Sequence, residues 1–273
     1  MNVESQPKIS QTYMDMRQLH QTKGNVGQSP LSAALLIIAL LAGLQATAHA
    51  QTSVSLYTGT SFTHRSDLQI QMPSTASDAI FRHVSWAARP FAQAPYYGYR
   101  LTHYFENSSH LGFSLDYTHY KIYARTGRIV PVEGIWNGVQ VNESAPLSRR
   151  VQDFNISHGV NMITANVLYR WRRQSASAVR EGRLQPYVGS GLIFYVPHSE
   201  STINNRSTSG RYQTSGFGYQ ALAGVQYGLI KRISIFVEAK FNIGTAKVDT
   251  AEQGRAETKL RTLHTLAGIS YRF

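Results

Sequence analysis

Apolar and polar side chains alternate with a period of two residues in repeated segments after residue 50. This period is typical of β-strands that separate two environments, because successive side chains of a strand point to opposite faces. No segment of this region has the period of an amphipathic helix. The alternating segments predict eight strands, at 52–63, 96–106, 111–123, 159–172, 184–197, 212–229, 232–244 and 263–273.

The last segment shows the alternation most clearly. Counting back from Phe273, one row contains Tyr271, Ile269 and Leu263, whereas the other row begins with Arg272 and Ser270. The same reasoning assigns the faces of most other segments, although those at 52–63 and 184–197 alternate too weakly. With apolar rows toward lipid and glycine-rich polar rows inside, the sequence predicts an all-β fold, an eight-stranded antiparallel transmembrane β-barrel.

The connections between these segments alternate in length. Those at 107–110, 173–183 and 229–231 are short or tight. This alternation predicts short periplasmic turns and long extracellular loops, with both chain termini of the barrel on the periplasmic side. The longer, polar connections are at 64–94, 125–153, 198–211 and 247–256.

A soluble eight-stranded carrier barrel of the lipocalin kind is the alternative, because the period alone does not say which face is inside. The glycine-rich polar rows and an exported N-terminus favour the membrane barrel. A final Phe273 after an alternating strand is also the pattern expected of chains delivered to the barrel assembly machinery of the bacterial outer membrane. That machinery is therefore a predicted partner, and the outer membrane is the predicted location.

The N-terminal region contains the one strongly apolar run, Leu31–Leu44. It is shorter than the roughly 20 residues that a membrane-spanning helix needs. The following Ala48-His49-Ala50 fits the small-x-small pattern of a signal-peptidase site. The sequence thus predicts a secretion signal peptide at 1–50, cleaved after Ala50, and a barrel at 51–273; an uncleaved N-terminal anchor is the alternative.

The chain is basic and lacks cysteine, with 27 Lys and Arg against 15 Asp and Glu and a formal net charge of +12. A basic chain favours acidic partners, and for an exported chain these are lipid phosphates and lipopolysaccharide. The zinc-finger, helix-turn-helix and RNP patterns of nucleic-acid binding are absent. Without cysteine, stability has to come from strand closure and packing.

The interior of the predicted barrel contains charges. Eight strands enclose a space that side chains can fill, so a general diffusion pore is not expected. Ionisable groups at membrane depth are costly unless paired, which makes them functional candidates. The favoured alternative is an internal salt-bridge network that fills the lumen. The inward charges are Arg100, Glu106, Asp116, Arg170, Glu238 and Lys240.

Histidines offer candidate chemistry. His119 follows Asp116 closely, and a His/carboxylate pair could hold a metal or move protons. Strict alternation, however, puts these two side chains on opposite faces unless a bulge intervenes. Ser157 and His158 are excluded as a nucleophile and its base for the same reason. With no nucleophile elbow, phosphate loop or zinc signature, a single His is expected to be an interfacial side chain.

Several blocks together resemble a known family, the outer-membrane lipid A oxidases, over most of 94–273. Two departures are His158, where the family has an acidic residue, and the long connection 125–153. The blocks are APYYGYR at 94–100, LGFSLDYTHYKIYA at 111–124, GVNMITANVLYRW at 159–171, PYVGSG at 186–191 with VPH at 196–198, and LAGISYRF at 266–273.

The resemblance implies an oxygen-dependent oxidation of the proximal glucosamine of lipid A, with a divalent metal as the natural means of handling oxygen. It carries over no established set of catalytic residues. Two alternatives remain: a non-enzymatic barrel with an adhesion, surface or structural role, and a lipid A deacylase, against which the missing Ser/His geometry counts. The candidate residues are Tyr97, Arg100 and Lys121 for substrate contact, Asp116 and His119 for metal or proton work, and Asn161 and Asn166 as further catalytic candidates.

Overall fold

The structure, a computed structural model, describes residues 51–273 apart from 93–94, 106–107, 109, 157–158 and 172–183. The predicted signal peptide with Ala48 and Ala50 lies outside the described residues, as do the predicted turn at 173–183, Glu106 and His158. Within the described residues, no helix is long and apolar enough to cross a membrane.

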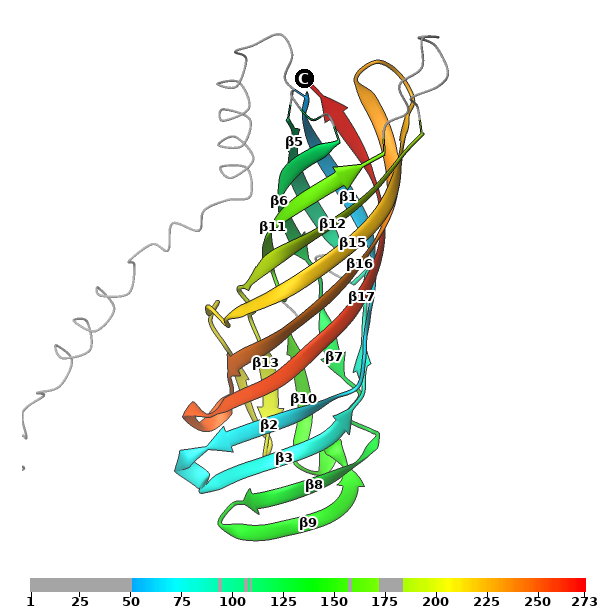
Figure 1. Cartoon of the computed structure of the whole chain (residues 1–273). Helices are drawn as coiled ribbons and strands as arrows, with labels where there is room; N and C mark the ends of the chain where they lie inside the picture. Colours follow the sequence, from blue (N-terminus) through cyan, green and yellow to red (C-terminus); the bar gives the residue numbers. More distant parts are fainter. Residues whose placement is uncertain (1–50, 93–94, 106–107, 109, 157–158, 172–183) are drawn as a thin grey trace, which may run out of the picture. The chain divides into compact units, whose positions relative to one another are not determined.

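Eight antiparallel strands close into a barrel, which confirms the predicted fold (Figure 1). Each strand pairs with the next barrel strand in chain order, and the first pairs with the last from Ser53–Arg272 to Thr63–Thr262. The barrel strands are β1 (Gln51–Thr63), β5 (Tyr97–Tyr104), β6 (Leu111–His119), β11 (Met162–Arg170), β12 (Leu184–Tyr195), β15 (Phe217–Gly228), β16 (Ile233–Asp249) and β17 (Arg255–Arg272).

The two faces of the barrel strands differ as the alternation predicts. On β17, Leu263 and Ile269 are exposed, whereas His264 and Ser270 are buried. The two strands whose faces the sequence left open follow the same rule, with Tyr57 of β1 buried inside. The barrel therefore has an apolar outer surface and a largely polar interior, and closure leaves it without an open edge.

Both ends of the described chain lie at the end of the barrel where the short connections are (Figure 1). Gln51 is paired with Tyr104, the last residue before the β5–β6 turn, and Arg272 is paired with Ser53. The long connections all leave the opposite end. This arrangement agrees with the predicted division into short turns on one side and long segments on the other.

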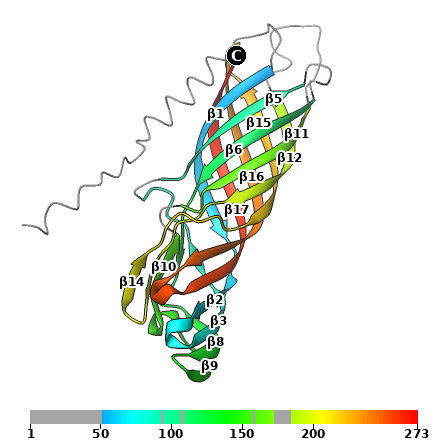
Figure 2. The ribbon, with the colours of Figure 1, turned by 90° about the vertical axis from the view of Figure 1, so that its left-hand side faces the viewer.

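The long connections are not the polar loops that the sequence predicts, because they fold into a cap of two β-sheets (Figure 2). One sheet continues the barrel sheet beyond β17, and the other is separate from it. The first consists of β2 (Ser66–Met72), β3 (Ser77–Val84), β8 (Ile129–Trp136) and β9 (Val139–Pro146); the second of β14 (Arg206–Ser209), β13 (Glu200–Ile203), β10 (Val151–Ile156), β7 (Ile122–Ala124) and β4 (Trp86–Ala87).

Two strand boundaries differ from the prediction because these segments of the chain extend from the barrel into the cap and pair with cap strands. The predicted loop at 247–256 shrinks to 250–254, since Arg255 pairs at once with Asp249 of β16 and with Gln71 of β2. The predicted strand at 111–123 divides into β6 and β7, and β7 pairs within the second cap sheet. Strand hydrogen bonds thus continue past the barrel.

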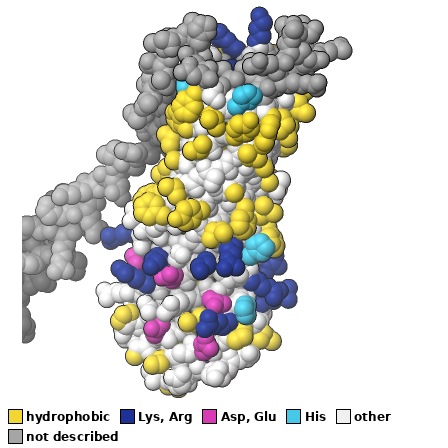
Figure 3. Space-filling model, in the orientation of Figure 1, with side chains coloured by type: hydrophobic (Ala, Val, Ile, Leu, Met, Phe, Trp, Pro, Cys, Tyr) yellow, Lys and Arg dark blue, Asp and Glu magenta, His cyan; other side chains and the backbone are white. Residues whose placement is uncertain are grey.

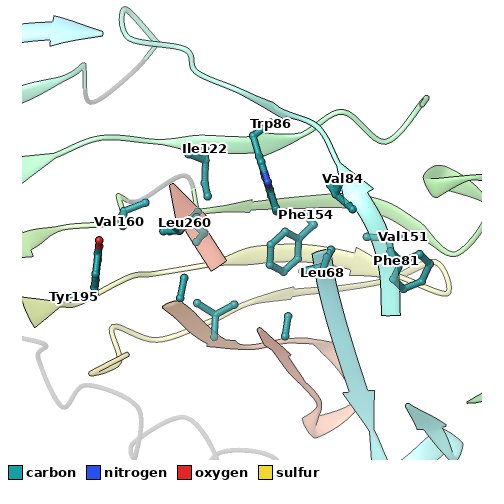
Figure 4. Packing of buried hydrophobic residues seen from close by; sticks show 14 of the residues in the cluster. Leu68, Phe81, Val84, Trp86, Ile122, Val151, Phe154, Val160, Tyr195 and Leu260 are labelled. Atoms are coloured by element: carbon teal, nitrogen blue, oxygen red, sulfur yellow. The ribbon is translucent and has the colours of Figure 1, made fainter. Parts of the chain in front are cut away.

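The cap has an apolar core between its sheets (Figure 4). Leu68, Phe81 and Phe154 are at most 1% exposed. The ring of Trp86 lies 6.1 Å from that of Phe154, and the ring of Phe81 lies 5.4 Å from that of Trp136. The same cluster continues through Tyr195 and Leu260 toward the barrel, so the cap and the barrel interior share one packed core.

A charged group ties three cap strands together at the surface. Arg82 of β3 forms ion pairs with Asp67 of β2, at 2.6 Å, and with Glu133 of β8. Partial burial raises the pKa of Asp67, but hydrogen bonds from the His83 backbone N–H and from Arg82 outweigh it. The net effect is a pKa below the ordinary value for aspartate.

We expect the cap to lose stability in acid partly through Asp67. Because folding lowers the pKa of this carboxyl, its contribution is complete above about pH 4 and is lost as the pH falls below that value. Asp67→Asn should therefore flatten the acid dependence of the free energy of unfolding. The measurement is urea unfolding followed by the fluorescence of Trp86 and Trp136, which lie in the cap core, in a Trp171→Phe background. An unchanged pH dependence in Asp67→Asn would contradict the expectation.

Candidate functional site

Four charged side chains meet inside the barrel, each at most 4% exposed. Arg100 lies opposite Asp116 in the β5–β6 register, and its Nη2 donates to Asp116 Oδ2 at 2.9 Å. Its Nη1 and Nη2 donate to the two oxygens of Glu238, each at 2.6 Å. Lys240 Nζ donates to Asp116 Oδ2 at 2.7 Å. We call these four residues the lumen network.

Two tyrosines that sequence reasoning missed complete this network. Tyr57 donates a hydrogen bond to Asp116 and accepts one from Lys240 Nζ at 3.0 Å. Tyr187 donates to Glu238 Oε2 at 2.7 Å. Both lie on the strands whose faces the sequence did not assign. Gly98 makes room for Tyr57, because a Cβ there would lie 2.1 Å from the tyrosine ring.

The lumen network is balanced in charge, with two cations and two carboxylates. Buried charges are tolerated when they are paired and hydrogen-bonded in this way. A cavity beside the network, on the side of the short turns and lined by described residues, has a volume of about 20 Å³, room for about one water molecule. On the cap side, His264 is bonded to Asn242 and Tyr96, each at 3.1 Å. The lumen is therefore filled.

Two further residues that were predicted to face the interior, Asn166 and Arg170, lie on β11 and contact side chains outside the lumen network. Asn166 Nδ2 donates to Ser114 Oγ at 3.2 Å, and its Oδ1 accepts from Gln220 Nε2 at 2.8 Å. The guanidinium carbon of Arg170 lies 3.6 Å from the centre of the Tyr104 ring, a cation–π contact. Both side chains are buried inside the barrel and contribute to its filling.

Asp116 and His119 are not brought together. Strand β6 pairs without a register shift on both sides, so strict alternation holds and no bulge intervenes. Asp116 points into the lumen, whereas His119 lies on the outer side of the sheet with Tyr97 and Asn161, where His119 and Asn161 are 4% and 5% exposed. The predicted candidates thus fall into two groups separated by the barrel wall.

The outer group forms what we call the rim cluster: Tyr97, Tyr117, His119 and Asn161. The rings of Tyr97 and His119 are stacked with centres 4.8 Å apart. Asn161 Oδ1 accepts from Tyr117 at 2.8 Å and lies 2.8 Å from His119 Nδ1. Asn161 adopts a positive φ of 38°, a conformation to which Asn is better suited than most residues. Lys121 follows β6 beyond this cluster and is partly exposed.

The candidate residues do not fit the divalent metal that the resemblance implies. Among the residues that the structure describes, no group of three or more His, Cys, Asp or Glu side chains could hold a metal ion. The oxygens of Asp116 are bonded to Arg100, Lys240 and Tyr57. Carboxylate and imidazole ligands would have to converge on one point, and the barrel wall separates Asp116 from His119.

The closed sheet, the apolar outer surface and the polar, filled interior define a membrane-spanning β-barrel of the kind found in bacterial outer membranes. In lipid, every backbone polar group must be satisfied internally, and a closed barrel does this without an edge. The outward row of alternate apolar side chains completes the description of an outer-membrane barrel.

Comparison with solved structures finds other small outer-membrane barrels. Neisserial surface protein A is 17% identical, over 83% of this chain and 100% of its own, with a TM-score of 0.38. OprG from Pseudomonas aeruginosa is 12% identical, over 82% and 96%, with a TM-score of 0.46. Ail of Yersinia pestis is 12% identical, over 82% and 100%, with a TM-score of 0.33. No family model matches the chain, and no curated protein sequence matches it. The class therefore rests on the barrel's own geometry.

Proposed function

We propose that this protein is a sealed outer-membrane barrel that acts at the cell surface through its cap. The observation that supports this proposal is the filled lumen: Arg100, Asp116, Glu238 and Lys240 neutralise one another and are at most 4% exposed. A barrel of this size with such an interior offers no path to solutes. The function is therefore expected to lie in the segments of the protein outside the membrane, above all in the cap.

The cap is suited to contact with molecules outside the cell. It is a folded β-structure around the apolar core that it shares with the barrel interior, and charges of both signs lie on its surface (Figure 3). Among the described strands, β9 pairs only with β8, so β9 is the open edge of the cap sheet that continues from the barrel. Val139 of β9 is 64% exposed there. Open strand edges are sites where another chain can add a strand.

This proposal is tested by changing the outermost hairpin. Cells producing the intact protein are compared with cells in which β8 and β9 are replaced by a short turn, and their adherence to host-cell and matrix surfaces is measured. We expect adherence to fall with the hairpin variant and to persist when the opposite turn at 229–231 is exchanged. Equal adherence of the intact and hairpin-exchanged proteins, both confirmed in the outer membrane, would contradict the proposal.

A second candidate function is the oxidation of lipid A, and the rim cluster is the observation that favours it. Tyr97, Tyr117, His119 and Asn161 join aromatic rings to polar atoms on the outer face near the cap. His119 and Asn161 are only 4% and 5% exposed, so a sugar held at the level of the lipid headgroups would contact the partly exposed rings of Tyr97 and Tyr117. Arg100 and Asp116, by contrast, could reach a lipid only if the barrel opened.

Lipid A mass spectra from strains with and without the gene separate the candidates. The surface proposal expects identical spectra. A gain of one oxygen atom that disappears in His119→Gln would support the oxidase instead. Loss of an acyl chain would identify a deacylase.

A further inference from the structure

An open groove lies on the outer surface where the barrel meets the cap, with a volume of about 720 Å³. Two phenylalanines from the apolar outer surface line one part of it, Phe62 and Phe241. Four arginines line another part, Arg65, Arg125, Arg128 and Arg261, and Thr63, His64, Ser85 and Trp86 complete the lining. We call this feature the basic groove. It shares no residue with the lumen network or the rim cluster.

The strand register places the groove at the boundary of the apolar surface. Phe62 and Phe241 both lie opposite Leu263, so three exposed apolar side chains form one row across β1, β17 and β16. The next outward residue of β17 is Arg261, whose carbonyl accepts from the His64 backbone N–H at 2.9 Å. The change from apolar to basic thus takes two residues, about 7 Å of strand. Figure 3 shows basic and histidine side chains gathering just beyond the apolar surface on one face.

The arginines come from separate parts of the chain that the fold holds together. Arg65 follows β1, Arg261 belongs to β17, and Arg125 and Arg128 lie between β7 and β8. The Arg125 backbone N–H donates to Ser85 O at 2.9 Å. That bond fixes the 125–128 turn against the segment before β4. The groove is therefore built by the same strands that join the cap to the barrel.

None of these four arginines has a carboxylate within salt-bridge distance among the described residues. Elsewhere on the cap, Arg82, Arg149, Arg150 and Arg206 each have such a partner. Four exposed cations in one groove repel one another, and an anion bound among them removes that repulsion. Guanidinium groups are also the side chains whose paired donors best match phosphate oxygens.

We propose that the basic groove binds the phosphate-bearing headgroup of a lipid in the surrounding outer leaflet. The phosphate lies among the arginines, and an acyl chain lies along Phe62 and Phe241. A lipid is favoured over a soluble phosphate because the apolar part of the groove continues into the lipid-facing surface. This site goes beyond the proposed function, since neither the cap edge nor the lumen takes part in it.

The test measures binding of lipid to the purified, refolded barrel in detergent by native mass spectrometry. The probes are lipid A with its phosphates, the same lipid after removal of the phosphates, and inorganic phosphate. We expect dephosphorylated lipid A to bind at least about 10-fold more weakly, since each basic residue near a membrane surface contributes on the order of 1 kcal/mol. Inorganic phosphate should compete only at far higher concentration.

Matched variants locate the site. Arg125→Gln/Arg261→Gln should weaken binding of phosphorylated lipid A by about 10- to 30-fold. Arg211→Gln/Arg255→Gln removes the same charge from exposed positions outside the groove and should leave binding unchanged. Equal losses in both pairs, equal binding of the two lipids, or equal competition by inorganic phosphate would overturn the proposal. The two lipids are compared on the unmodified protein, so that result does not depend on the folding of a variant.

Discussion

Replacing Arg100 by methionine is expected to lower the free energy of unfolding of the barrel by about 3–5 kcal/mol. Arg100 is the side chain that joins Asp116 to Glu238, and all three are at most 4% exposed. Its removal leaves Glu238 without two hydrogen bonds of 2.6 Å in a site that water reaches poorly. The measurement is urea unfolding of the protein in lipid vesicles, followed by electrophoretic mobility with and without heating.

Two further variants identify the cause of this loss. Arg100→Met/Glu238→Gln restores the charge balance, with Asp116 and Lys240 still paired at 2.7 Å, and should recover part of the stability. Arg149→Met removes an exposed ion pair and should change the free energy of unfolding by less than about 1 kcal/mol. If Arg100→Met were as stable as the unmodified protein, the lumen network would not hold the barrel together.

The second large effect is expected in the cap. Phe154→Ala should destabilise the cap by about 3–5 kcal/mol, because it leaves a cavity in a well-packed core. Phe154 is fully buried beside Trp86. We expect the cap to become sensitive to protease while the barrel keeps its heat-dependent electrophoretic mobility. Limited proteolysis followed by mass spectrometry of the fragments gives both readouts.

Phe91→Ala is the matched control. This substitution makes the same change in composition, but at a side chain that is 89% exposed. Its cap should resist protease as the unmodified cap does. If Phe154→Ala left cleavage of the cap unchanged, the two sheets would not depend on the core they share. If it abolished the heat-dependent mobility, the cap and the barrel would unfold as one unit.

The barrel could be predicted from the sequence because lipid imposes one rule on every strand. A side chain that faces lipid is apolar and its neighbours face the interior, so Phe273 was enough to assign the faces of β17. The cap could not be predicted in the same way. Leu68, Ile70 and Met72 alternate as a strand does, but the segment is short and stands between polar residues. Its pairing with β17 joins residues nearly two hundred positions apart, such as Leu68 and Thr258.

The lumen network could be predicted only in part, because alternation gives the face of a side chain but not its contacts. Alternation indicated that Arg100, Asp116, Glu238 and Lys240 face inward, but not which of them meet. Arg100 and Glu238 are 138 residues apart in sequence, and the closure of the barrel brings them together. Alternation also predicted that Asp116 and His119 lie on opposite faces. The basic groove could not be predicted from the sequence, because its arginines are spread over 65–261 and only the folded cap brings them together.

The sealed lumen is tested most directly by the ion conductance of the purified protein in a planar lipid bilayer. With Arg100, Asp116, Glu238 and Lys240 filling the interior, we expect no stable conductance steps at neutral pH, although the protein is inserted. A porin of larger bore, inserted under the same conditions, serves as the positive control. Reproducible open-channel steps from the unmodified protein would contradict a barrel that is closed by its own side chains.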